Sequence, residues 1–154
     1  MNDYSLPIEL RYLFQNQYLD SVKLLIILNQ FQRRKKGIVL DELNYYFTML
    51  NLVESNDDKF VVNRKYLQDN YLSNESKIKR QSVVLGNQEY IDISMEKTSK
   101  KSILYFSITD KGKNILDMLK DEYFNILTEQ FWYIYGIHRY SVTNQRKVLK
   151  RDEK

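Results

Sequence analysis

Apolar residues recur at helical spacing in three parts of this chain. Residues 18–35 (YLDSVKLLIILNQFQRRK) carry an apolar stripe wide enough to cover two faces, which predicts a buried, central helix. Apolar residues repeat at the same period in residues 41–50, where two early acids suit the start of a helix. They do so again in the stretch after residue 110, where residue 109 or 110 can cap the start of a last helix. This last helix either runs to about residue 135 or breaks near Thr128. Residues 38–40 (IVL) predict a short strand.

Apolar and polar residues alternate in two runs further along the chain. Residues 89–95 (EYIDISM) and 102–108 (SILYFSI) place apolar side chains on one face and polar side chains on the other. The connection between them, residues 96–101, contains three lysines, so the pattern predicts an antiparallel hairpin with a basic tip. The preceding residues 63–86 have helix-capping signals at two places, and the sequence leaves open whether they form one helix or two.

The remaining segments carry less pattern. Residues 6–17 contain Pro7, which suits the start of a helix, and they predict a short helix or a packed arm. Residues 51–63 predict a loop in which residues 60–62 can be extended. We expect one domain over residues 1–140 and a basic, flexible tail over residues 141–154, because the tail is polar and lacks a long apolar stripe.

The order of these elements is helix, short strand, helix, helix, hairpin and helix, as in a winged helix-turn-helix domain. The expected fold class is therefore α+β and mostly helical, with the β-hairpin as the wing and the last helices as a C-terminal extension. Ile108–Gly112 (ITDKG) resembles the junction between a wing strand and a capped helix that is common in winged-helix regulators. The order of the elements carries more weight than these five residues.

The composition argues against an enzyme. The chain has 154 residues, no cysteine and a single histidine, His138. Thiol chemistry and a thiolate metal site are therefore excluded, and a histidine-based zinc site lacks ligands. We expect no catalytic residue, no metal and no cofactor. The N-terminus has no leader pattern and no apolar run reaches the length of a membrane span, so we expect a cytoplasmic protein without membrane contact.

Basic residues are concentrated locally. The net charge is +4, yet residues 1–138 carry 18 charges of each sign and are neutral. Within them, residues 77–101 have six basic and three acidic side chains, at the place where a winged-helix protein would contact duplex DNA. The alternative is that these side chains only keep the surface solvated. The candidate DNA-contacting residues are Lys77, Lys79, Arg80, Gln81, Lys97, Lys100 and Lys101.

Aromatic side chains gather near the C-terminal end. Phe, Trp and Tyr make up 14% of the chain. Neighbouring residues on a helix diverge by about 100°, so one helix cannot bury all of these rings and some must face a second surface. Large aromatic side chains with a polar atom are favoured at protein interfaces, although a thick core is the alternative. The candidate partner-binding residues are Tyr123, Phe124, Phe131, Trp132, Tyr133 and Tyr135.

Two stretches also resemble a known family. Ser21–Phe31 (SVKLLIILNQF) and Val39–Leu50 (VLDELNYYFTML) resemble the opening of the middle components of bacterial ABC-type three-component defence systems, the Lamassu-like group. With the later hairpin and the ITDKG junction, the resemblance covers residues 18–50 and 89–120. It implies a small winged-helix accessory subunit that binds an SMC-like ABC ATPase and a further effector subunit in an anti-phage complex. The matching positions are core positions, so the resemblance assigns no functional residue.

Two functions from different classes therefore remain open. The first is a non-catalytic adaptor on the ATPase, with or without sequence-independent contact to duplex DNA. The second is a free-standing winged-helix transcription regulator that binds DNA as a homodimer, paired through its C-terminal helices. A neutral body with a locally basic hairpin and surplus aromatic side chains favours the adaptor.

Overall fold

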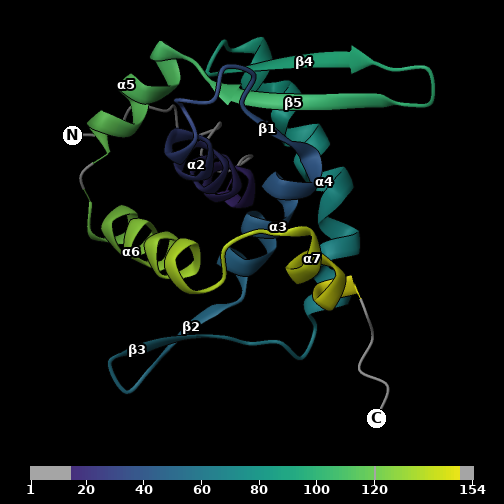
Figure 1. Cartoon of the computed structure of the whole chain (residues 1–154). Coiled ribbons are helices and arrows are strands. Elements are labelled where there is room, and N and C mark those ends of the chain that lie inside the picture. The colour runs from purple at the N-terminus through teal and green to yellow at the C-terminus, as the bar shows by residue number, and fades with distance from the viewer. Residues whose placement is uncertain (1–14, 120, 150–154) are drawn as a thin grey trace.

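The central helix of the fold is α2 (Gln15–Gln30). A computed structural model describes residues 15–119 and 121–149 of the chain, so almost all of the arm expected over residues 6–17 lies outside the described residues. Other elements surround α2 (Figure 1), and its residues 24–28 are all buried. This confirms the buried, central helix that the wide apolar stripe predicts.

A three-stranded antiparallel sheet lies against α2. Strand β1 (Ile38–Val39) pairs with β5 (Ser102–Ile108), and β5 pairs along its whole length with β4 (Ile91–Lys97). The β4–β5 hairpin projects beyond the rest of the molecule, at the top right of Figure 1. The hairpin predicted from the alternating runs is confirmed, together with its lysine-containing tip.

Two helices, α3 (Leu40–Asn51) and α4 (Leu67–Asn87), pack against each other and against α2. Residues 42–50 of α3 are all buried. The segment that the sequence leaves open as one helix or two is a single helix of 21 residues. In place of the predicted loop before it, the chain forms a second hairpin from β2 (Val53–Asn56) and β3 (Lys59–Val62).

A chain of buried hydrogen bonds fixes the rotation of α4 against α3. The Asn74 side-chain amide donates to the Thr48 hydroxyl at 2.9 Å, and that hydroxyl donates to Asn44 Oδ1 at 3.0 Å. Asn44 Nδ2 then donates to the carbonyl of Tyr71 at 2.9 Å. Because buried polar groups are costly when unpaired, this network holds one face of α4 inward and leaves the opposite face in solvent.

The C-terminal part of the described chain forms three helices: α5 (Asp110–Met118), α6 (Glu122–Ile137) and α7 (Val142–Leu149). The break between α5 and α6 comes at Leu119, earlier than the position that the sequence predicts. The backbone of Leu119 is extended. Asp121 then caps α6, because its side chain accepts a hydrogen bond from the backbone N–H of Phe124.

Helix α7 occupies residues for which the sequence predicts a flexible tail. Val148 is buried against the body, and Gln145 Nε2 donates to the hydroxyl of Tyr71 on α4 at 2.7 Å. In place of an unstructured tail, residues 142–149 form a helix that docks through buried Val148, partly buried Leu149 and polar contacts. Residues 150–154 of the expected tail lie outside the described residues.

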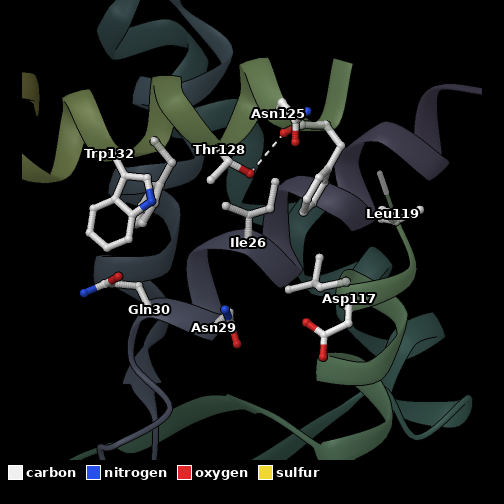
Figure 2. A pocket seen from close by; sticks show the side chains of 11 residues that line it. Ile26, Asn29, Gln30, Asp117, Leu119, Asn125, Thr128 and Trp132 are labelled. Atoms are coloured by element: carbon white, nitrogen blue, oxygen red, sulfur yellow. Dashed lines mark hydrogen bonds between the residues drawn. The ribbon is translucent and has the colours of Figure 1, made fainter. Parts of the chain in front are cut away.

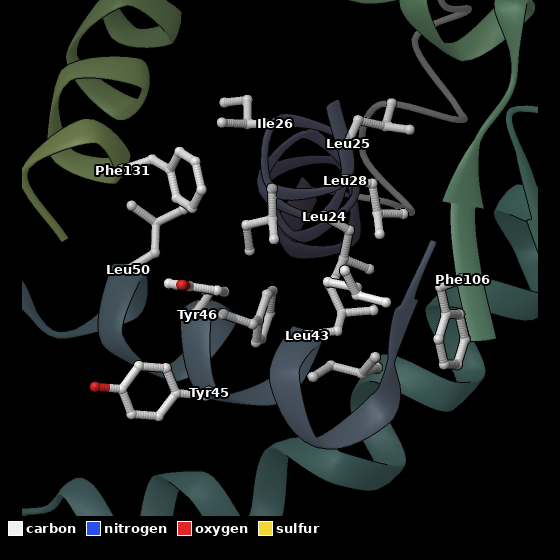
Figure 3. Close-up of a cluster of buried hydrophobic side chains, with 14 of the residues drawn as sticks. Leu24, Leu25, Ile26, Leu28, Leu43, Tyr45, Tyr46, Leu50, Phe106 and Phe131 are labelled. Carbon is white, nitrogen blue, oxygen red and sulfur yellow. The ribbon is translucent and has the colours of Figure 1, made fainter. Parts of the chain in front are cut away.

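The core is built around α2, as Figure 3 shows. Buried side chains of α2, α3, strand β5 and α6 belong to one cluster, so one core joins helices and sheet. The fold class is therefore α+β and mostly helical, with small antiparallel sheets, as expected. The largest fully buried side chains are Tyr45, Tyr46, Phe47, Phe106 and Phe131.

Candidate macromolecular interfaces

The exposed face of α4 holds basic residues proposed for DNA contact, and two of them are already paired within the chain. Lys77 Nζ lies 3.9 Å from the carboxylate of Asp20 on α2. Lys79 Nζ lies 3.3 Å from the carboxylate of Glu75, one turn earlier. Arg80 is exposed, and no acidic side chain in the described part of the chain pairs with it. Among these three cations, Arg80 is therefore the best placed for contact with a phosphate group.

Gln81 belongs to the opposite, inward face of α4. Its side chain is 7% exposed, and its Nε2 donates to the Ser21 hydroxyl at 2.6 Å. Ile78, one turn earlier on the same side of the helix, is fully buried. The structure therefore corrects the expectation that Gln81 contacts DNA, because this side chain ties α4 to α2.

A partly buried polar cluster surrounds the ion pair of Lys77. Burial raises the pKa of the Asp20 carboxyl group, and the nearby ammonium groups of Lys77 and Lys23 lower it in part. Burial lowers the pKa of Lys23, whose Nζ donates to Asn51 Oδ1 at 2.8 Å. These contacts join α2, α3 and α4, and the ion pair of Lys77 with Asp20 links α4 to α2.

Two aliphatic side chains on α4 face solvent. Leu72 is 59% exposed and Val83 is 55% exposed. They are separated by about three helical turns and therefore share one face. Next to Val83, Gly86 brings α4 close to strand β4, because a Cβ added at Gly86 would lie only 3.5 Å from Ile93 Cδ1. The exposed face of α4 thus continues onto the β4–β5 hairpin.

The side of the hairpin that faces α4 is apolar except at the tip, where Lys97 lies opposite Ser102. Ile91 and Phe106 are buried in the core. Ile93, the partner of Phe106 on the edge strand β4, is 38% exposed, and Met95, closer to the tip, is 56% exposed. We call four exposed side chains the helix–hairpin surface: Leu72, Val83, Ile93 and Met95.

The hairpin tip carries Lys97, Lys100 and Lys101, all exposed. Thr98 organises this turn, since its hydroxyl donates to the carbonyl of Lys101 at 3.0 Å and accepts the backbone N–H groups of Lys100 and Lys101. Within residues 15–119 and 121–149, no acidic side chain pairs with the three lysines. An ordered turn with unpaired cations is suited to contact with phosphate groups.

The basic run at residues 33–36 lies beside the same hairpin but is partly neutralised. Lys36 Nζ lies 2.7 Å from a carboxylate oxygen of Glu96 on β4. This hydrogen bond raises the pKa of Lys36 and lowers that of Glu96. Arg34 Nη1 pairs with Glu42 Oε1 at 2.8 Å. These two cations therefore connect the loop to the fold.

The aromatic residues of α6 divide between core and surface. Phe131 is 1% exposed, with its ring centroid 5.6 Å from that of Tyr46 on α3. Trp132 is 53% exposed and Tyr123 is 46% exposed. The prediction that one helix cannot bury all of these rings is confirmed. Phe131, however, is a core residue and is not accessible to a partner, which corrects its proposed role.

Three further rings from the candidate interface are half-buried. Phe124 packs against the core at the start of α6. Tyr133 lies against Phe60 of the β2–β3 hairpin, with ring centroids 5.8 Å apart. The guanidinium group of Arg139 covers the ring of Tyr135 at 4.1 Å. These three rings are largely occupied by neighbours in the chain itself.

The described residues contain no group of His and carboxylate side chains that could hold a metal ion. None of their helices combines the length and the apolar character that a membrane span requires. Comparisons with protein-family models, with curated proteins and with solved structures gave no match. Function must therefore be argued from the surfaces described above.

Proposed function

We propose that this chain is a non-catalytic adaptor of winged-helix architecture. The order α2, β1, α3, α4 and β4–β5 hairpin supports this proposal, with the β2–β3 hairpin inserted between α3 and α4, and α4 corresponds in order to a recognition helix. The partner is an SMC-like ABC ATPase that works with a further effector subunit in a cytoplasmic antiviral complex. This choice of partner is supported by the resemblance of residues 18–50 and 89–120 to the middle components of such systems.

The helix–hairpin surface is the observation that carries the proposal. A helix that reads DNA presents polar side chains to base edges in the major groove. Here α4 presents Lys79 and Arg80 but also Leu72 and Val83. Val83 lies next to the apolar inner face of the hairpin, where Gly86 approaches Ile93. Neighbouring apolar side chains on an exposed, projecting surface are typical of protein interfaces. The surface therefore favours a protein partner over base recognition.

Co-purification with the ATPase tests the adaptor function. The chain is co-expressed with a tagged coiled-coil ATPase encoded by a neighbouring gene, and the complex is measured by size-exclusion chromatography with light scattering. We expect a stable complex for the natural sequence and its loss for Val83→Asp and for Met95→Asp. The matched control is Met118→Asp on α5, because Met118 is 70% exposed and lies outside the helix–hairpin surface. No complex with the natural sequence would contradict the proposal.

DNA binding by the hairpin tip is the second candidate, favoured by its unpaired lysines. Combined Lys97→Glu, Lys100→Glu and Lys101→Glu should weaken binding to any duplex, and the log–log salt slope should fall by roughly 0.9 for each phosphate group that the variant no longer neutralises. A matched triple reversal of charge at Lys59, Arg64 and Lys65 serves as the control. Tight, sequence-specific binding in a gel-shift assay would instead favour the homodimeric regulator. Binding that the tip variant leaves unchanged would exclude the tip from the DNA surface.

A further inference from the structure

An open cavity of about 280 Å³ lies between α2, α5 and α6. Figure 2 shows Trp132 at one end, Asp117 and Asn29 facing one another at the other end, and Ile26 between them. Leu119 also lines the cavity, at the side away from Trp132. The volume is near the lower limit of ligand sites in proteins, so the cavity suits a group about as large as one long side chain.

The Asp117 end of the cavity is electronegative. Asp117 is exposed in the last turn of α5, and Asn29 lies in the last turn of α2. Two helix C-termini therefore meet at this end, and the carbonyl groups of each carry negative partial charge. The described residues that line the cavity include no lysine or arginine. A cationic ligand group therefore fits this end better than a neutral or an anionic group.

The Trp132 end offers a flat stacking surface. Two neighbouring rings already hold guanidinium groups of the chain, since Arg34 lies 4.5 Å from the ring of Phe31 and Arg139 lies 4.1 Å from the ring of Tyr135. The ring of Trp132, 6.1 Å from that of Tyr135, has no such cation among the described residues. Indole is the best of the aromatic side chains for stacking with planar or cationic groups.

We propose that this cavity binds an organic cation with an apolar stem, of the kind that an arginine residue presents. The guanidinium group pairs with the carboxylate of Asp117, the methylene stem lies over Ile26, and the group at the far end of the stem lies against the ring of Trp132. The same chemistry has two sources, an arginine side chain of a macromolecular partner or a free molecule such as agmatine. The inference does not depend on the proposed function, because none of the lining residues belongs to the helix–hairpin surface.

Fluorescence of the intact protein provides a direct test, because Trp132 is the only tryptophan in the sequence. The probes are acetyl-Gly-Arg-Gly-amide, the same peptide with uncharged citrulline in place of arginine, and agmatine. We expect a saturable change in fluorescence with a guanidinium probe and none with the citrulline peptide. Saturation by the arginine peptide alone assigns the site to a partner's side chain, and saturation by agmatine alone assigns it to a free molecule.

Two variants that each remove one negative charge locate the site. Asp117→Asn should weaken binding of the guanidinium probe about fivefold, the upper range for an exposed ion pair. Glu129→Gln should leave it unchanged, since Glu129 is exposed on α6 and does not line the cavity. Three results would overturn the proposal. They are binding of the citrulline peptide as tight as that of the guanidinium probe, binding of the guanidinium probe by Asp117→Asn as tight as by the natural sequence, or no saturation by any probe up to about 50 mM.

Discussion

Gly37 is the residue that permits the turn from the end of α2 into the sheet. Its φ angle is +90°, in the left-handed region, and a Cβ there would lie 1.9 Å from the carbonyl oxygen of Phe106 on β5. That oxygen belongs to the backbone of the central strand and cannot move aside without disturbing the β-ladder. No residue other than glycine fits here without strain.

Gly37→Ala should therefore lower the free energy of unfolding by about 2–4 kcal/mol, measured by urea denaturation. Gly136→Ala on α6 is the control, because nothing lies within 4 Å of the Cβ that it would add. That substitution should be neutral or stabilising by up to about 1 kcal/mol, as expected for alanine in a helix. Equal losses in the two variants would contradict the role given to Gly37.

Tyr46 makes the free energy of unfolding fall as the pH rises in the alkaline range. The side chain is fully buried, burial raises its pKa to about 12, and its hydroxyl accepts the N–H of Tyr140 at 2.9 Å. Above pH 10 the unfolded chain loses the phenolic proton while the folded chain retains it, so folding is progressively disfavoured. This contribution is fully present below pH 10 and is lost as the pH rises towards 12.

Urea unfolding between pH 8 and 12 measures this contribution. Above pH 10, the natural sequence should lose about 1.4 kcal/mol per pH unit through this one group. Tyr46→Phe should be less stable by about 1 kcal/mol at pH 8, because the N–H of Tyr140 loses its acceptor, and its curve should fall less steeply above pH 10. Tyr66→Phe, at a ring that is 53% exposed, should fall like the natural sequence. Parallel curves for all three proteins would refute the assignment.

Individual side chains were predictable from the sequence where the signal was local. Thr109, one of the two caps that the sequence allows, caps α5, with its hydroxyl accepting the N–H of Gly112 at 3.1 Å. Gln81 and Phe131 were assigned to surfaces wrongly, because their exposure depends on how a helix is rotated against its neighbours. For α4, the buried hydrogen bonds of Asn44 and Asn74 set that rotation, and no spacing rule reveals them.

The β2–β3 hairpin is indicated only in part by the sequence, which allows extended residues at 60–62 and predicts a loop for the rest of the segment. Its turn residues Asp57 and Asp58 have φ angles of +52° and +65°, a conformation that glycine or asparagine usually supplies. Without either residue in that turn, the sequence predicts a loop. Regular strand signals were present elsewhere, and there the alternation of apolar and polar residues predicted β4 and β5 correctly.

Asp58→Gly should stabilise the protein by about 0.5 kcal/mol, because glycine adopts a positive φ without the cost that a Cβ brings. Asp92→Gly is the contrasting variant, since Asp92 lies within β4 and glycine weakens a strand by about 1 kcal/mol. Thermal unfolding monitored by circular dichroism compares the two. The explanation of the turn fails when Asp58→Gly destabilises the protein as much as Asp92→Gly does.

At the scale of the whole molecule, two surfaces lie on different sides of one core. In Figure 1, α5 and α6 are on the left, whereas α4 and the projecting hairpin are on the right. The helix–hairpin surface lies on α4 and β4, whereas the cavity beside Trp132 is lined by α2, α5 and α6. The order of elements is predictable from the sequence because periodicity is local. The exposure of Leu72 and Val83 is not, because it depends on which face of α4 packs inward.

Hydrogen–deuterium exchange of the chain alone and with the purified ATPase tests the adaptor function most directly. Binding should slow exchange in the backbone of α4 around residues 72–83 and in the β4–β5 hairpin, and this protection should be absent in Val83→Asp. The β2–β3 hairpin should exchange at the same rate in both samples. Protection confined to other elements, or no protection at concentrations well above those used for co-purification, would contradict the account.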